Sequence, residues 1–123
     1  MQYAANLYTG SLFKAGLKWA LSVAAPEDIR ILSAKYGFIK LGRVIEPYDV
    51  RMGDKGQVSD EELKLTAATE GVLIAREVRV LGGLDYFERV VSCGVTHAQR
   101  VMPSGLGLIK QIQWLTRNVG KTA

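Results

Sequence analysis

The segment Ile29-Arg30-Ile31-Leu32-Ser33 is a short apolar run that ends at a small polar residue, and it predicts a short strand. Residues 10–24, which precede it, have the period of a helix. One stripe of that helix consists of Leu12, Gly16, Trp19 and Val23. Pro26 separates the helix from the strand, because proline cannot continue a helix.

The same alternation continues along the chain. Residues 78–81 and residues 100–102 predict two further strands, and each is followed by a predicted helix, over residues 85–91 and 107–118. Helices that alternate with strands are typical of a parallel sheet covered on both faces. The sequence therefore predicts a single domain over residues 1–123 with a three-layer α/β fold. Its sheet is expected to be mainly parallel and Rossmann-like, with helices on both faces.

A helix predicted over residues 59–77 begins with a capping box, in which Ser59 and Glu62 bond each other's backbone. Its apolar residues fall on two stripes rather than one. They are Leu63, Ala67 and Ile74 on the first stripe, and Leu65, Ala68, Val72 and Ala75 on the second. A helix of this kind is buried on more than one side, by its own domain or by a second subunit. We therefore expect a homo-oligomer, in the first place a homodimer rather than a larger assembly.

Composition limits the class of protein. Hydrophobic residues make up 48% of the 123 and charged residues 23%, an ordinary globular balance. One cysteine cannot form an internal disulfide, the first residues lack the pattern of a signal peptide, and no apolar run approaches the ~20 residues that cross a bilayer. We expect a cytoplasmic protein with no membrane partner. No acidic residue follows Glu88, so the C-terminal third forms either a basic surface suited to phosphate or a solvated face.

Ligands of parallel sheets bind outside the carboxyl ends of the strands, so the turns at those ends are candidate sites. Gly105-Leu106-Gly107 follows a predicted strand and opens a helix, where free N–H groups and the helix dipole suit a phosphate. Gly105, Gly107 and Lys110 are the predicted phosphate-binding residues, and a tight turn that needs glycine is the alternative. Lys110 stands where a dinucleotide fingerprint has its third glycine, and no cofactor is expected.

The last predicted helix carries basic residues with an aromatic between them. Lys110, Trp114, Arg117 and Lys121 share one face of it. Single-stranded or flipped-out nucleic acid is bound by this combination of charge and stacking surface. Trp114, Arg117 and Lys121 are thus a predicted nucleic-acid surface, with packing of Trp114 under an adjoining segment as the alternative.

Candidate catalytic groups lie in the loop Glu46-Pro47-Tyr48-Asp49-Val50-Arg51 and beside the first strand. Glu46 or Asp49 could act as a general base toward water or hold a base or ribose, and a loop brace between Asp49 and Arg51 is the alternative. Lys35 could neutralise a phosphate or a developing anion, or be an exposed lysine. Cys93 and His97 lie four residues apart, but two potential ligands do not make a metal site, and no metal is expected.

Several patches together resemble a small phage and bacterial domain family of unassigned function. They are Leu7-Tyr8-Thr9-Gly10-Ser11-Leu12-Phe13, Ile31-Leu32-Ser33-Ala34-Lys35-Tyr36-Gly37, Ile45-Glu46-Pro47-Tyr48-Asp49, Gly82-Gly83 with Tyr86, Pro103-Ser104-Gly105-Leu106-Gly107 and Gln111-Ile112-Gln113-Trp114-Leu115. That family is similar to the YaaA peroxide-stress proteins, which share the layout of a strand, Ser-x-x-Tyr-Gly and then Pro-Tyr. The resemblance implies a Rossmann-like core akin to uracil-DNA-glycosylase-type domains, which act on or bind bases in nucleic acid.

The resemblance also implies which residues form a site. Their counterparts here are Ser33, Lys35, Tyr36, Glu46, Tyr48, Asp49 and the Gly105-Leu106-Gly107 turn, and Tyr8 lies in the first patch. Relatives begin with a further strand that ends in a Ser-Cys-Ser-Lys-like turn ahead of the Leu-Tyr-Thr-Gly patch, and this chain departs from them there. A relative that binds without catalysis is therefore an alternative.

These observations predict a nucleic-acid or nucleotide base-processing domain with N-glycosylase-like hydrolysis of a base. Asp49, Glu46 and Lys35 are the predicted catalytic residues, and Tyr36, Tyr48, Ser33 and Tyr8 the predicted base- or substrate-binding residues. The base must leave its stack for such chemistry, which explains an aromatic side chain next to a basic surface. The alternative is a non-catalytic binder or sequestering protein for a small nucleotide derivative. A structural oligomer without a ligand is the third interpretation.

Overall fold

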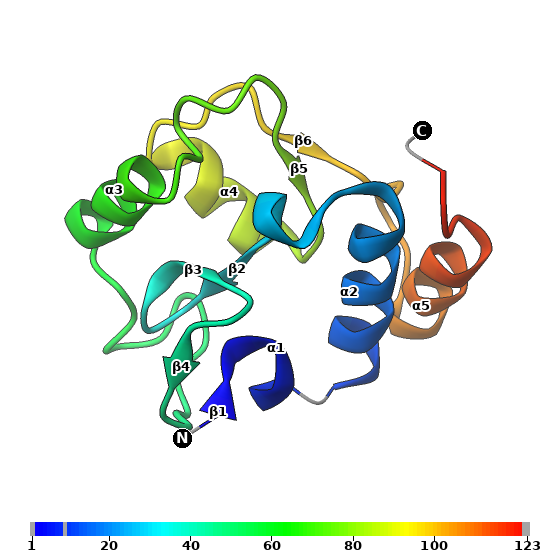
Figure 1. Cartoon of the computed structure of the whole chain (residues 1–123), viewed down its shortest axis with the longest axis horizontal. Helices are drawn as coiled ribbons and strands as arrows, with labels where there is room; N and C mark the ends of the chain where they lie inside the picture. The colour runs from blue at the N-terminus through cyan, green and yellow to red at the C-terminus, as the bar shows by residue number, and fades with distance from the viewer. Residues whose placement is uncertain (1, 9, 122–123) are drawn as a thin grey trace.

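The computed structural model describes residues 2–8 and 10–121 (Figure 1). Thr9, in the first of the family-like patches, lies outside the described residues. The helices are α1 (Ala4–Leu7), α2 (Ser11–Val23), the short 3-10 helix η1 (Pro26–Asp28), α3 (Asp60–Thr69), α4 (Leu84–Ser92) and α5 (Leu108–Arg117). The strands are β1 (Gln2–Tyr3), β2 (Arg30–Ser33), β3 (Gly37–Lys40), β4 (Val44–Ile45), β5 (Arg79–Val80) and β6 (Gln99–Arg100).

The predicted mainly parallel sheet is wrong. Strand β2 pairs antiparallel with β3, its neighbour along the chain, and strand β1 pairs antiparallel with β4. Among the described residues, β5 and β6 are the only parallel pair; they pair over two residues each and form a sheet separate from β2. The described residues thus form three two-stranded sheets, and they lack the extended sheet that a three-layer Rossmann-like fold requires.

The physical reason lies in the hairpin of β2 and β3. Ser33 pairs with Gly37 across the turn, so the residues expected after the carboxyl end of a parallel strand form a hairpin turn instead. The buried Ser33 hydroxyl accepts the backbone N–H groups of Lys35 and Tyr36, which holds this turn closed. Gly37 has a φ of +77°, a conformation that L side chains rarely adopt. Strand β2 therefore finds its hydrogen-bonding partner in β3, the next strand along the chain, rather than in a distant parallel strand.

Helices α2 and α5 pack against each other at one end of the molecule, and α3 covers β3 at the other (Figure 1). Three apolar clusters hold these parts together. The first gathers Leu63 and Ala67 of α3 with Phe38, Val90 and Val95, among others. The second lies between α1 and the hairpin, and the third between α2 and α5.

Local signals for helices are confirmed more often than the pairing of strands. The predicted helices over residues 10–24, 85–91 and 107–118 correspond to α2, α4 and α5. The Ser59 hydroxyl accepts the Glu62 N–H at 3.1 Å, as the capping box predicts, but α3 ends at Thr69 rather than at residue 77. Leu65 and Ile74 are 63% and 88% exposed, so the described chain does not bury both predicted stripes.

No helix within the described residues is long and apolar enough to span a membrane.

Candidate functional site

Four residues predicted to bind a base or substrate come together at one place. Tyr8 follows α1, Ser33 ends β2, Tyr36 lies in the hairpin turn and Tyr48 follows β4. Ser33 Oγ donates to the Tyr48 hydroxyl at 2.8 Å, and the hydroxyls of Tyr48 and Tyr8 share a short hydrogen bond. We call these four residues the tyrosine cluster.

Ser33 fixes the direction of the hydrogen bonds in this cluster. A serine hydroxyl has one proton and two lone pairs. Both lone pairs of Ser33 Oγ accept backbone N–H groups, from Lys35 at 3.1 Å and Tyr36 at 3.0 Å, so its proton goes to Tyr48. The hydroxyls of Ser33, Tyr48 and Tyr8 carry three protons but form two hydrogen bonds with one another. One phenol O–H, of Tyr8 or of Tyr48, therefore remains to donate to a ligand or to water.

The rings of the cluster are packed edge to face. The Tyr48 ring centroid lies 5.7 Å from that of Tyr36 and 6.2 Å from that of Tyr8, with interplanar angles of 84° and 76°. Phe13 of α2 lies against Tyr8, with the centroids 5.1 Å apart. This packing is favourable for aromatic pairs and gives the cluster a defined shape.

Two cations lie against the Tyr36 ring. Lys35 Nζ is 5.3 Å from the ring centroid and Arg43 Cζ is 5.1 Å from it. Both side chains are exposed, whereas the ring is half-buried. The cluster therefore presents an aromatic surface bordered by positive charge, held in place by cation–π contacts.

The surroundings of Tyr8 in the cluster make its phenol less acidic. Burial raises its pKa well above the ordinary value of 10.0, and the hydrogen bond with Tyr48 adds to the increase, while Ser33 opposes it. Tyr86 of α4 is close enough to contribute a smaller increase of the Tyr8 pKa. The Tyr8 phenol is neutral near pH 7, so it can donate a hydrogen bond but does not serve as a base.

Of the three predicted catalytic side chains, that of Lys35 contacts this cluster. Lys35 contacts the Tyr36 ring, and Asp49 follows Tyr48 directly in the chain. Asp49 and Glu46 are both exposed, and neither forms an ion pair within the described part of the chain. No ion pair joins Asp49 to Arg51 there either. The backbone N–H of Arg51 donates to the carboxylate of Asp54 at 2.9 Å.

The predicted phosphate turn is exposed and open. Gly105 has a φ of +83°, which explains the glycine without a ligand, whereas Gly107 is the N-cap of α5 with an ordinary φ of −73°. Gln111 Nε2 donates to the Leu106 carbonyl at 2.9 Å. Lys110 is exposed on the first turn of α5. Among the described residues, no hydrogen bond or ring contact joins this turn to the tyrosine cluster.

The three residues of the predicted nucleic-acid surface differ in their exposure. Trp114 is half-buried and packs against the cluster of Trp19, Met102 and Leu115, so the packing alternative describes its position. Arg117 and Lys121 are exposed on and after α5. Their contact with nucleic acid stays a prediction.

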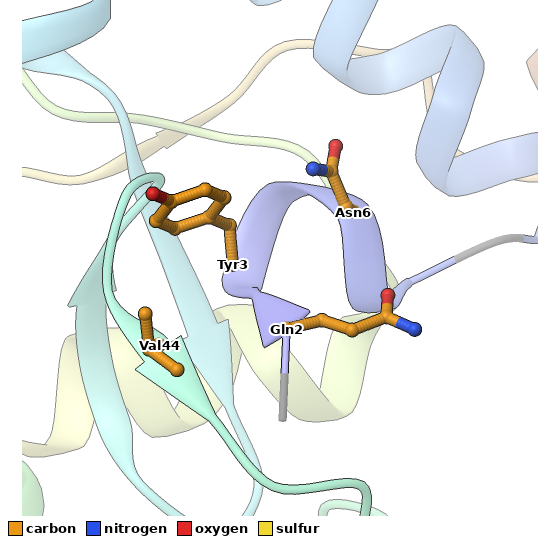
Figure 2. Close-up of a pocket in the computed structure, with 4 residues that line it drawn as sticks. All are labelled: Gln2, Tyr3, Asn6 and Val44. Carbon is orange, nitrogen blue, oxygen red and sulfur yellow. The ribbon is translucent and has the colours of Figure 1, made fainter.

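Two cavities lie outside the predicted site residues. The first, of about 300 Å³, is lined by Gln2, Tyr3, Asn6 and Val44. Figure 2 shows Tyr3 beside its strand partner Val44, with the amide groups of Gln2 and Asn6 pointing away from that pair. No charged side chain lines this first cavity within the described residues. The second, of about 720 Å³, lies at the turn between β3 and β4 and includes Arg43 in its lining.

A model of a family of unknown function, DUF6884, matches residues 1–117. The chain belongs to the DUF6884 family. The predicted membership of a family of unassigned function is therefore confirmed. No curated protein and no solved structure matched the chain, so the comparisons carry no link to peroxide-stress proteins or to uracil-DNA glycosylases.

Three residues of this DUF6884 chain contribute to the cluster although the sequence did not predict them. Arg43 lies against Tyr36, Phe13 packs on Tyr8, and Tyr86 affects the pKa of Tyr8. Phe13 and Tyr86 belong to patches that resemble the family, which was a usable signal. Arg43 had no signal in the sequence, because the turn that brings it back to Tyr36 follows a strand that was not predicted.

Proposed function

We propose that this protein binds the base of a nucleotide derivative or of an unpaired nucleic-acid strand at the tyrosine cluster, without catalysing its hydrolysis. The observation that carries the proposal is the convergence of Tyr8, Ser33, Tyr36 and Tyr48 through hydrogen bonds and ring contacts. The resemblance of the sequence patches to proteins that act on or bind bases points to the same class of ligand.

The chemistry of the cluster suits a base and its phosphate. Every base has a π face that stacks on an aromatic side chain, and cations beside the aromatic meet the phosphate. Lys35 and Arg43 supply those cations at the Tyr36 ring. The remaining phenol O–H suits a carbonyl oxygen or ring nitrogen at the edge of a base, because both accept hydrogen bonds.

Binding is favoured over hydrolysis by the protonation and exposure of the groups at hand. Hydrolysis of the bond between a nucleobase and its sugar needs a general base that activates water. The Tyr8 phenol is neutral, since its pKa is raised, and the carboxylates of Glu46 and Asp49 lie exposed in water. The cluster therefore supplies hydrogen-bond donors and stacking surfaces rather than a general base.

N-glycosylase-like hydrolysis is the second candidate, and one observation favours it. Asp49 directly follows Tyr48, whose hydroxyl belongs to the cluster, so its carboxylate is carried by the same short segment. Closure of that segment over a bound base would bring Asp49 toward the sugar. Release of a free base from single-stranded DNA or RNA, lost in Asp49→Asn while binding persists, would establish this activity.

Calorimetric titration of the protein with nucleoside monophosphates and short single-stranded oligonucleotides tests the binding proposal. Tyr36→Leu should weaken binding roughly tenfold, because stacking of a base on an aromatic side chain contributes about 1–3 kcal/mol. Tyr3→Leu is the control, since Tyr3 is 57% exposed and lies outside the cluster. Absence of binding by the unmodified protein, or equal weakening in both variants, would overturn the proposal.

A further inference from the structure

The larger cavity is an open groove of about 720 Å³, a volume typical of small-molecule sites. Its walls come from η1, from the ends of β2 and β3, from the turn between β3 and β4, and from the residue after α3. Its charged lining residues are Glu27, Arg30, Lys40, Arg43 and Glu70. None of these five belongs to the site that the sequence predicted.

Arg30 and Glu70 form the fixed part of this groove. Arg30 Nε lies 3.1 Å from Glu70 Oε1, and both side chains are largely buried, with 20% and 22% exposed. The Arg30 guanidinium also donates to the backbone carbonyls of Glu27 at 2.6 Å and Ile29 at 3.0 Å. The Arg30 guanidinium is therefore held by contacts within the protein, and its charge is balanced by the Glu70 carboxylate.

Lys40 and Arg43 are the cations of the groove that remain available to a ligand. Both are exposed, and neither forms an ion pair with a carboxylate within the described residues. Glu27 supplies the one opposing charge, since its carboxylate has no ion-pair partner within the same residues. Two cations against one carboxylate leave the groove positive, with Glu27 on the η1 wall and the cations on the strand side.

Arg43 belongs to both the groove and the tyrosine cluster. It lines the groove, and its guanidinium carbon lies 5.1 Å from the centre of the Tyr36 ring. A ligand with an aromatic part at Tyr36 therefore has an anion-binding groove directly beside it. Guanidinium groups bind phosphate through two parallel hydrogen bonds, and lysine adds a compact charge.

We propose that the groove at the turn between β3 and β4 binds phosphate groups through Arg43 and Lys40. The inference rests on the proposed function in one respect, because it assigns these phosphates to the ligand whose base lies at the tyrosine cluster. It places the phosphate beside Arg43 rather than at the Gly105-Leu106-Gly107 turn. Phosphate of a free nucleotide and phosphate of a nucleic-acid backbone share this chemistry, and the experiment separates them.

Calorimetric titration with inorganic pyrophosphate tests the groove by itself. Arg43→Gln and Lys40→Gln should each weaken binding roughly fivefold to tenfold, because each removes a charge-assisted contact. Glu27→Gln should strengthen binding about twofold to threefold, since it removes the opposing charge. Lys14→Gln on α2 is the control for net charge, because Lys14 is exposed and does not line the groove.

The outcomes separate the groove from the proposed function. Equal weakening in Lys14→Gln and Arg43→Gln, or weakening in Lys110→Gln alone, would overturn the groove. Loss of nucleotide binding in Tyr36→Leu with unchanged pyrophosphate binding in Arg43→Gln would overturn the groove and leave the proposed function standing. Pyrophosphate binding that depends on Arg43, without tighter binding of any nucleotide, would support the groove and overturn the base site. Tighter binding of a nucleoside diphosphate than of a single-stranded oligonucleotide, per site and at equal salt, would identify a free nucleotide as the source, and the reverse would identify nucleic acid.

Discussion

Replacement of Gly37 by alanine tests the hairpin that positions the tyrosine cluster. A Cβ atom at Gly37 would lie 2.5 Å from Thr66 Oγ1 and 3.3 Å from Thr66 Cβ, well inside normal contact distance. Thr66 cannot move freely, because its hydroxyl donates to the Leu63 carbonyl at 2.9 Å and accepts the Phe38 N–H at 3.1 Å. The substitution therefore disturbs the contact between β3 and α3.

The expected cost has two parts. A non-glycine residue in the left-handed conformation costs about 1–2 kcal/mol, and Gly37 has a φ of +77°. The contact with Thr66 adds about 1–3 kcal/mol, the usual cost of an overpacked site. We expect Gly37→Ala to lower the free energy of unfolding by about 3 kcal/mol. For a chain of this size the urea midpoint falls by roughly 2 M.

Two other glycines provide matched controls for urea unfolding. Gly53 has a φ of +99° with nothing near its absent Cβ, so Gly53→Ala should show the conformational cost alone, about 1 kcal/mol. Gly42 lies in open space without a positive φ, and Gly42→Ala should be nearly neutral. If Gly37→Ala costs no more than Gly53→Ala, the packing of the hairpin on α3 is wrong. A loop at this position in place of β3 would give that result.

Two further predictions concern the segment of residues 55–60, which Arg89 contacts, and the acidity of Tyr8. The guanidinium of Arg89 donates to the side chain of Gln57 and to the Val58 carbonyl, and it lies 3.1 Å from the Asp60 carboxylate. Arg89→Met should therefore lower the free energy of unfolding by about 2–4 kcal/mol and speed tryptic cleavage at Lys55. The exposed Arg76→Met is the control, and unchanged cleavage in Arg89→Met would show that Arg89 does not hold this segment. Because the folded state raises the pKa of Tyr8 above 10.0, the contribution of Tyr8 to stability is complete below about pH 10 and is lost at higher pH as the unfolded chain ionises. In an alkaline titration of phenolate absorbance, one step should therefore lie above pH 10 and be missing in Tyr8→Phe, and a step that persists in that variant would refute the assignment.

Helices were predictable from the sequence because their signals are local. The Ser59 cap, the stripe of residues 12–23 and the glycine before α5 each lie within a few residues of the helix that they define. Strand pairing was not predictable, because a short strand does not encode its partner. Four glycines between residues 37 and 56 indicated a loop and concealed β3, the strand that pairs with β2.

The site divides in the same way. The family-like patches implied one site made of Ser33, Lys35, Tyr36, Glu46, Tyr48, Asp49 and the Gly105-Leu106-Gly107 turn, with Tyr8 in the first patch. Hydrogen bonds and ring contacts join Tyr8, Ser33, Tyr36 and Tyr48 although the predicted sheet is wrong, and none joins the glycine turn to them among the described residues. A parallel sheet was not needed, because the hairpin turn and the segments after α1 and β4 carry these side chains to one place. Arg43 could not be predicted, since its contact with Tyr36 depends on the return of the chain after β3.

The central claim is that a base binds at the tyrosine cluster. Titration of the isotope-labelled protein with a nucleoside monophosphate and with a short single strand, followed by NMR chemical shifts, tests it most directly. We predict that the signals of Tyr8, Ser33, Tyr36 and Tyr48 shift together and saturate with one apparent Kd. Shifts confined to residues 105–121, or no saturable shift in the cluster, would contradict the claim.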